Sequence, residues 1–178
     1  MRFRHLIYTL FFCWNLLTGC GPSESSANVP SDFHLIVDAH SVVSDGKAPA
    51  QNVNIEIYAN GKVVFDRYNT NGVISFDEDH MVTYSANQVI ETGKFELNSR
   101  QLESLWDAIE AINFFALTDD YRMSIGLAYT FMMVEANGQR HVVDNIGLEM
   151  AEMKTIAALL NTFLPEEAMI VYREGFLQ

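Results

Sequence analysis

Hydrophobic and polar positions alternate with a period of two in the segment that follows residue 52. Residues 53–58 alternate apolar and polar side chains, which is typical of a half-buried strand. Asn60-Gly61 follows, and Lys62-Val63-Val64-Phe65 continues as a second strand-like run. An Asn-Gly pair between such runs predicts a β-hairpin in which both turn residues accept a positive φ angle.

Similar patterns predict further strands along the chain. The predicted segments are residues 33–40, 73–76, 81–84, 88–96, 127–135 and 141–145. Asn71-Gly72 predicts a tight turn before residue 73, and Asn137-Gly138 predicts a second hairpin. Residues 169–172 are apolar and are expected to form a last short strand or to pack across the core.

Apolar side chains at spacings of three and four predict two helices. The first begins at Asn98, which can cap free backbone N–H groups while Gln101 reaches back, as in a capping box. Its apolar stripe comprises Leu102, Leu105, Trp106, Ile109 and Ile112. The second helix spans about residues 149–163 and ends before Pro165. Its stripe comprises Ile156, Leu159, Leu160 and Phe163.

Hairpins that lead into helices predict an α+β fold, with two helices packed on one face of an antiparallel sheet. Residues 59–62 and 136–139 have similar sequences, Ala-Asn-Gly-Lys and Ala-Asn-Gly-Gln. An internal duplication of a hairpin-then-helix unit would explain this likeness. Independent use of the commonest hairpin turn would explain it as well, and we favour that interpretation.

The N-terminal segment has the three parts of an export signal. Arg2 and Arg4 precede an apolar run over residues 6–17, and Leu-Thr-Gly stands directly before Cys20. This ending resembles the lipobox of bacterial lipoproteins, which implies that Cys20 is acylated and becomes the first residue of the mature chain. An uncleaved transmembrane anchor would need about 20 apolar residues. The run is shorter and contains Asn15.

Cleavage would divide the chain into three parts. We expect a lipoprotein signal peptide over residues 1–19, a lipidated flexible tether over residues 20–32, and one α+β domain over residues 33–178. The tether is rich in small polar residues and contains Pro22 and Pro30. The domain is long enough to bury its own core. The expected location is the bacterial cell envelope, on the periplasmic or cell-surface side of a membrane.

Charge and cysteine usage exclude several functions. Loss of Arg2 and Arg4 reduces the 11 basic residues to nine against 23 acidic ones, a net charge of about −14. Such a chain repels nucleic acid and anionic lipid, so we expect membrane attachment through acyl chains alone. Cys13 leaves with the signal and Cys20 carries lipid. The folded domain therefore has no disulfide, cysteine nucleophile or cysteine-ligated zinc.

One segment resembles the later part of a calcium-binding EF-hand loop. Its candidate ligands are Asn69, Asn71, Asp77 and Glu78. However, Arg67 stands at the first position, where an EF-hand needs an acid, and the flanking segments are predicted strands rather than helices. An ordinary hairpin explains the Asn-Gly turn, and we favour it over a metal site.

Three other groups of side chains could carry chemistry. Residues 77–80, Asp-Glu-Asp-His, could bind a metal, although neighbouring strand residues point to opposite faces and a solvated acidic turn is favoured. One face of a predicted strand carries His34, Asp38 and His40, which could bind a metal as a loose two-histidine, one-carboxylate set. Alternatively, they are hydrogen-bonded structural residues. Residues 119–122, Asp-Asp-Tyr-Arg, could divide acid and base roles or form a simple turn.

The middle of the chain resembles an uncharacterised family of bacterial secreted domains. The likeness covers about residues 53–164 and rests on the motif Asn-Phe-Phe-Ala-Leu at residues 113–117 followed by Tyr121. Residues 55–65, residues 93–97, Leu102 and Asn137-Gly138 also match. That family usually carries cysteines before the first hairpin, whereas residues 41–50 have none. The resemblance supports the predicted fold and leaves the function open, because no activity is assigned to that family.

The sequence has no phosphate-binding glycine loop, no G-x-S-x-G elbow and no H-E-x-x-H pair. Trp106 lies on an apolar helix stripe and is expected in the core rather than on a sugar-binding surface. We therefore expect a non-catalytic interaction module that contacts another envelope protein, needs no cofactor and binds no nucleic acid. The alternative is a metal-dependent or carboxylate-based enzyme, or a small-ligand binder, at residues 119–120 or 77–80.

Overall fold

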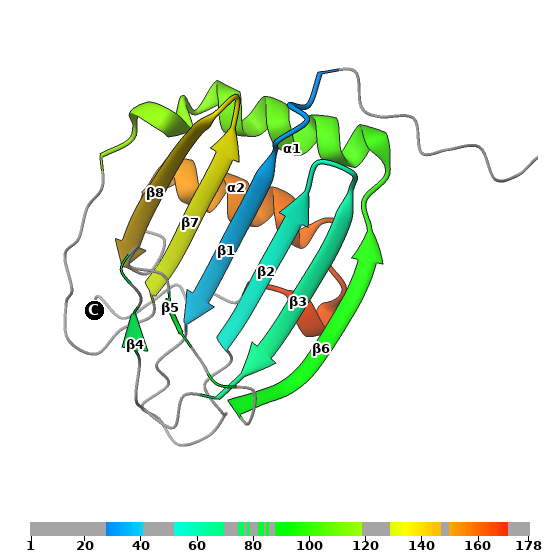
Figure 1. Cartoon of the computed structure of the whole chain (residues 1–178), viewed down its shortest axis with the longest axis vertical. Coiled ribbons are helices and arrows are strands. Elements are labelled where there is room, and N and C mark those ends of the chain that lie inside the picture. Colours follow the sequence, from blue (N-terminus) through cyan, green and yellow to red (C-terminus); the bar gives the residue numbers. More distant parts are fainter. Residues whose placement is uncertain are drawn as a thin grey trace, which may run out of the picture.

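The computed structural model describes residues 28–40, 52–69, 75–76, 78, 82–83, 85, 88–118, 129–146 and 150–170. Within these ranges six strands form one antiparallel sheet in the order β6-β3-β2-β1-β7-β8 (Figure 1). The strands are β1 (His34–His40), β2 (Asn52–Tyr58), β3 (Lys62–Tyr68), β6 (Val89–Glu96), β7 (Tyr129–Ala136) and β8 (Gln139–Ile146). A separate ribbon pairs β4 (Ser75–Phe76) with β5 (Val82–Thr83).

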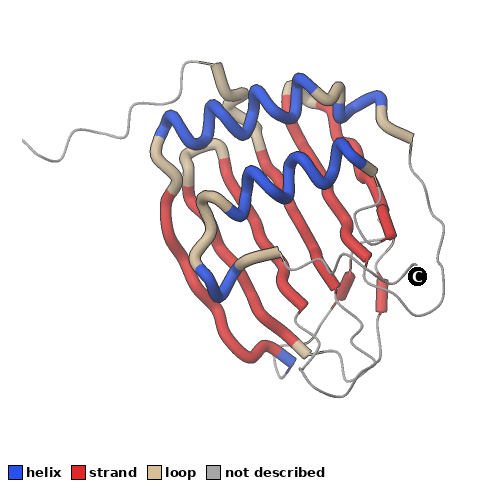
Figure 2. The backbone as a smooth tube through the Cα atoms, turned by 180° about the vertical axis from the view of Figure 1, so that it is seen from behind, coloured by secondary structure: helices blue, strands red, loops and turns tan. Residues whose placement is uncertain are grey.

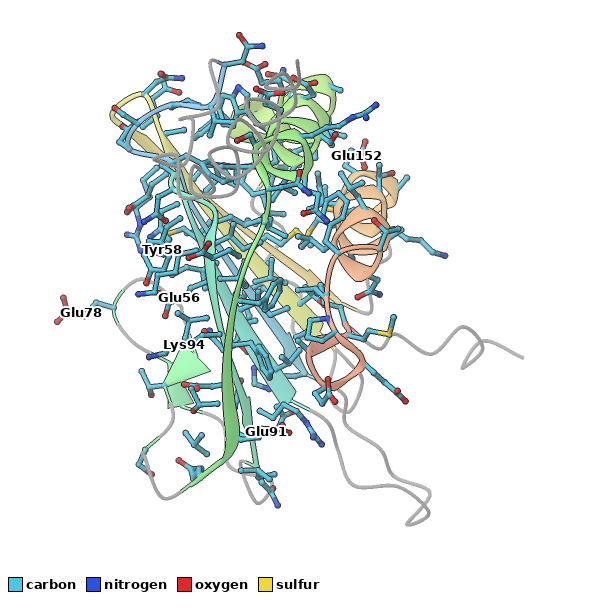
Figure 3. All side chains as sticks on the ribbon, turned by 90° about the vertical axis from the view of Figure 1, so that its right-hand side faces the viewer. Glu56, Tyr58, Glu78, Glu91, Lys94 and Glu152 are labelled. Carbon is cyan, nitrogen blue, oxygen red and sulfur yellow. The ribbon has the colours of Figure 1, made fainter. Side chains whose placement is uncertain are left out.

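Two helices cover one face of this sheet, α1 (Ser99–Ala111) and α2 (Ala151–Asn161) (Figure 2). Short 3-10 helices follow each of them, η2 (Phe114–Ala116) and η3 (Glu166–Ala168). The predicted α+β class, with an antiparallel sheet and two helices on one face, is confirmed. We call the opposite side of the sheet the helix-free face (Figure 3).

The core lies between the sheet and the two helices. Leu35, Val37, Ile55, Ile57 and Val63 point from the strands into it and are buried. The predicted stripe of α1 is confirmed, because its members are buried or packed against the core. These are Leu102, Leu105, Trp106, Ile109 and Ile112. From α2 the core receives Met153, Ile156, Ala157 and Leu160.

The start of α1 matches the predicted capping box. The Asn98 side chain accepts a hydrogen bond of 3.0 Å from the Gln101 backbone N–H. The Gln101 side chain accepts one of 3.0 Å from the Asn98 backbone N–H. Two backbone donors that would otherwise lack a partner are thereby satisfied, which fixes where β6 ends and the helix begins.

The two Asn-Gly hairpins close with different turns. Asn137 and Gly138 both have positive φ angles, 54° and 69°, as predicted for this pair. In the first hairpin only Gly61 has a positive φ angle, 82°, and its N–H donates to the Tyr58 carbonyl at 2.8 Å. The prediction that both Asn60 and Gly61 accept positive φ is therefore wrong. A three-residue loop ends in Gly61, and that position alone needs a left-handed conformation.

Gly61 has a second constraint besides its backbone conformation. A Cβ atom at this position would lie 2.4 Å from the carbonyl oxygen of Leu97, which is too close for any side chain. The Leu97 N–H in turn donates to the Gly61 carbonyl at 2.8 Å. The hairpin turn thus packs directly against the chain between β6 and α1.

Candidate functional site

The helix-free face of β1 carries His34, Ile36, Asp38 and His40, because alternate residues of a strand share a face. The two ends of this row differ in exposure. His34 is partly exposed near the hairpin turns, whereas Asp38 and His40 have only 0% and 3% of their surface exposed. No helix in the described ranges covers this face, so the burial of two polar side chains there marks an unusual site.

Asp38, His40 and Tyr68 form a closed triangle of polar atoms, which we call the buried cluster. Tyr68 Oη donates to Asp38 Oδ1 at 2.6 Å and lies 2.7 Å from His40 Nε2. His40 Nε2 lies 2.8 Å from the same Asp38 oxygen. Tyr68 belongs to β3 and has 1% of its surface exposed, so its ring reaches across β2 to meet residues of β1.

The sheet register explains why these three residues meet. His40 pairs with Asn52, and Asn52 pairs with Tyr68, so the three side chains lie in one row on the helix-free face. Asp38 pairs with Asn54 in the neighbouring row, and Asn54 Nδ2 donates to Asp38 Oδ2 at 3.4 Å. Asn52 is also buried. The polar rows are therefore built by strand pairing rather than by a loop.

The contacts of the buried cluster join β1 to β3. Tyr68 Oη donates to Asp38 Oδ1, and His40 Nε2 lies within hydrogen-bonding distance of both groups. The tautomer of the imidazole sets which of these contacts it donates.

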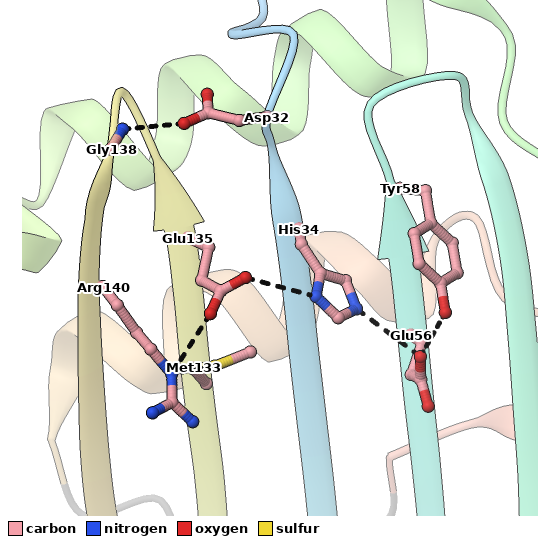
Figure 4. A network of polar contacts seen from close by, with 8 residues as sticks. All are labelled: Asp32, His34, Glu56, Tyr58, Met133, Glu135, Gly138 and Arg140. Carbon is pink, nitrogen blue, oxygen red and sulfur yellow. Dashed lines mark hydrogen bonds and ion pairs between the residues drawn. The ribbon is translucent and has the colours of Figure 1, made fainter.

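A second group of polar side chains lies on the exposed half of the helix-free face, and we call it the surface network (Figure 4). It consists of His34, Glu56, Tyr58, Glu135 and Arg140. The His34 imidazole lies between two carboxylates, with Nε2 at 3.5 Å from Glu56 and Nδ1 at 3.7 Å from Glu135. Its ring stacks on Tyr58, with centroids 4.7 Å apart.

The surface network spans four neighbouring strands and is held together by an ion pair, a hydrogen bond and ring stacking. Arg140 Nε on β8 lies 3.2 Å from Glu135 on β7 and donates to the Met133 sulfur at 3.0 Å. Lys62 on β3 lies over the Tyr58 ring, 5.4 Å from its centroid. These contacts hold the side chains of the surface network against one another.

The hydrogen bond between Tyr58 and Glu56 shifts the pKa values of the two side chains in opposite directions. The hydrogen bond to Glu56 raises the pKa of Tyr58 to about 12, because ionisation of the phenol would remove the proton that it donates. The His34 hydrogen bond and the Tyr58 hydrogen bond lower the pKa of Glu56 against the effect of its partial burial. Both groups keep their ordinary charge states near neutral pH.

Asp32 fixes the chain just before β1. Its carboxylate accepts hydrogen bonds from the backbone N–H groups of Gly138 at 2.7 Å and Asn137 at 2.9 Å, which lower its pKa. Val29 packs against the core, and the Phe33 N–H donates to the Pro30 carbonyl at 3.0 Å. Contacts with the domain therefore begin before residue 33, where the sequence predicts the start of the domain.

The structure separates the residues of one predicted metal set. Asp38 and His40 meet in the buried cluster, whereas His34 lies in the surface network with Glu56 and Glu135. Four residues along a strand separate two side chains by about 13 Å, too far for one ion. Among the described residues, no group of three or more His, Cys, Asp or Glu side chains could hold a metal ion.

The calcium-like segment follows β3 and contains β4, so strands stand where an EF-hand needs helices. Of its candidate ligands the structure describes Asn69, whose N–H donates to the Gln88 carbonyl at 2.9 Å, and Glu78, which is exposed. Asn71 and Asp77 lie outside the described residues, as do residues 79–80, residues 119–122 and Cys20.

The sequence did not single out Tyr68, Glu56, Tyr58 or Glu135 as site residues. Strand periodicity places Glu56 and Tyr58 on one face, and that signal was present in residues 53–58. The contact between Tyr68 and Asp38 depends on the register of three strands, which no local pattern contains.

Comparison of the sequence with protein-family models and with curated proteins finds no match. Of the helices in the described part of the chain, none has the length and apolar character needed to cross a membrane. The candidate function therefore depends on the geometry of the helix-free face and on the N-terminal sequence.

Proposed function

We propose that the protein is anchored by acyl chains on Cys20 to a membrane of the bacterial cell envelope and acts as a non-catalytic protein-interaction module. The observation that carries this proposal is the surface network on the exposed half of the helix-free face. There, His34, Tyr58 and Arg140 are ordered by neighbouring carboxylates on strands of a rigid sheet.

The surface network has the composition of a binding surface. Tyrosine and arginine are enriched at the energetic centres of protein interfaces. Side chains that are already held in place lose less conformational entropy when a partner binds. Lys62 over the Tyr58 ring and Arg140 beside Glu135 supply positive charge on a face of a strongly acidic protein, so charge complementarity would favour one orientation of a bound partner.

Lipid anchoring is supported by the sequence alone, through the apolar run before Cys20. The mature net charge of about −14, from nine basic and 23 acidic residues, disfavours direct attraction to anionic lipid. Acyl chains would therefore supply the membrane affinity, and two or more are needed for stable attachment. The partner would be another protein of the same membrane or of the adjoining compartment.

Co-purification after chemical cross-linking in intact cells tests the proposal. We expect a stoichiometric partner with the wild-type protein and a loss of at least about tenfold in its recovery with Tyr58→Ala or Arg140→Glu. Glu110→Lys on the exposed side of α1 is the matched control and should leave recovery unchanged. Recovery of the protein alone, or equal loss with the control, would contradict the proposal.

The buried cluster favours a second candidate, an enzyme or small-ligand binder. Asp38, His40 and Tyr68 bring a carboxylate, an imidazole and a phenol within 2.8 Å of one another. Chemistry there would require opening, because all three side chains are buried. A small molecule that shifts the imidazole signal of His40 in a nuclear magnetic resonance titration would support this candidate over the interaction module.

A further inference from the structure

The two edges of the sheet are not equally exposed. At β8, His141 Nε2 lies 2.9 Å from the Leu117 carbonyl oxygen, so the chain that follows η2 covers part of that edge. At the other edge, β6 pairs with β3 alone among the described strands, and no described element lies beyond it (Figure 1). An open edge strand presents backbone donors and acceptors to another strand.

The outward-pointing residues of β6 follow from its hydrogen bonds. The Leu97 N–H donates to the Gly61 carbonyl, so Leu97 bonds toward β3. In an antiparallel pair the bonding residues alternate, and Glu96, Lys94 and Thr92 therefore direct their backbone groups away from β3. The side chains of these three residues are exposed, and Lys94 lies on the helix-free face (Figure 3).

Lys94 and Glu96 are arranged symmetrically about Phe95. If two β6 strands pair antiparallel around a two-fold axis at Phe95, Lys94 of each copy lies directly opposite Glu96 of the other. Each dimer then contains two reciprocal ion pairs, both at positions that share backbone hydrogen bonds. We propose that β6 is a homodimerisation edge, at which a second copy of this chain extends the sheet around Phe95.

Other two-fold registers lack this complementarity. An axis at Gly93 would place Ile90 opposite Glu96, and an axis at Lys94 would place two lysines opposite each other. Registers between these would put the side chains of one copy on the wrong face of the joined sheet. Lys94 and Glu96 therefore disfavour most pairings of the open β6 edge but permit the two-fold pairing centred on Phe95.

Phe95 supplies the apolar centre of this arrangement. It points to the helix side, is only partly buried, and packs against Phe65 with ring centroids 6.5 Å apart. In the proposed dimer the two Phe95 residues would occupy a non-hydrogen-bonded pair, the position at which side chains of antiparallel strands approach most closely. Each Phe95 ring would therefore cover the Phe95 ring of the other copy. The dimer edge lies apart from the surface network and does not depend on the proposed function.

Zero-length cross-linking of the full-length lipidated protein tests this edge. Purified protein labelled with light nitrogen is mixed with an equal amount labelled with heavy nitrogen and reconstituted together into lipid vesicles. A carbodiimide then joins a lysine to a carboxylate in direct contact as an amide, with loss of water. We expect peptides that link Lys94 of one isotope to Glu96 of the other, which only an intermolecular contact produces.

Charge reversal gives the control. Neither single variant can form this amide, so their association is measured by sedimentation equilibrium in detergent instead. Lys94→Glu alone and Glu96→Lys alone should each weaken dimerisation at least about tenfold, since two attractive pairs become repulsive. The double variant K94E/E96K should restore dimerisation, and Glu110→Lys should have no effect. Absence of mixed-isotope peptides from the wild-type protein, or a double variant that stays monomeric while its circular dichroism is native, would overturn the proposal.

Discussion

Tyr68 on β3 donates a hydrogen bond of 2.6 Å to Asp38 on β1, although β2 lies between their strands. Both side chains are almost fully excluded from solvent. A buried polar group without its partner is costly, whereas a fully satisfied network specifies one arrangement. The contact therefore holds the register of three strands in addition to joining two side chains.

Removal of the Tyr68 hydroxyl is expected to destabilise the fold. Tyr68→Phe removes the shortest hydrogen bond to the buried Asp38 carboxylate, and we expect a loss of about 1–3 kcal/mol in the free energy of unfolding. Tyr58→Phe removes a phenol hydroxyl from a solvent-accessible site and should cost only about 0.5 kcal/mol. Urea unfolding followed by circular dichroism measures both. Equal midpoints for the two variants would contradict the role of the buried cluster.

The two hairpin glycines provide a matched pair of substitutions. Gly138→Ala meets no atom within 4 Å and should cost only the left-handed conformation, about 1–2 kcal/mol. Gly61→Ala has the same conformational cost and also places its Cβ 2.4 Å from the Leu97 carbonyl oxygen. We therefore expect a clearly larger loss of thermal stability for Gly61→Ala, measured by calorimetry. The reverse order would show that Leu97 does not constrain the turn.

Local sequence patterns predicted the secondary structure well, because the information they use is local. The Asn98 and Gln101 capping box and the apolar stripe of α1 both depend on neighbouring residues, and both are found in the fold. The Asn60-Gly61 turn was mistaken in type, since its loop length is set by how β2 and β3 pair. A dipeptide does not carry that information.

The candidate site was less predictable than the fold. Strand periodicity correctly placed His34, Asp38 and His40 on one face, but their partners come from other strands. Glu56 draws His34 into the surface network, and Tyr68 draws His40 into the buried cluster. Which residues meet is decided by sheet register, a long-range property that emerges only when the core is packed.

The pKa of Tyr58 gives a prediction for alkaline pH. Its folded pKa of about 12 exceeds the ordinary value of 10.0, so the folded state holds the phenol proton more tightly. This contribution to stability is complete below pH 10 and is lost as the pH rises toward 12. We expect Glu56→Gln to move the ionisation of Tyr58 back toward 10.0, followed by phenolate absorbance relative to Tyr58→Phe. An unchanged titration would argue against the hydrogen bond.

Membrane attachment is predicted to depend on one residue. Cys20→Ala removes the only acylation site that the sequence offers after cleavage. We expect this variant to lose labelled palmitate and either to appear in the soluble fraction or to accumulate as uncleaved precursor. Gel mobility after fractionation separates these results. A variant that stays in the membrane at mature size would refute the lipid anchor.

The most direct test of the interaction module is site-specific photo-cross-linking in living cells. A photoreactive amino acid replaces Tyr58 in the surface network or, as control, Glu110 on the exposed side of α1. We predict a discrete adduct with one envelope protein from position 58 and none from position 110. No adduct from position 58, or the same adducts from both positions, would contradict a binding role for the helix-free face.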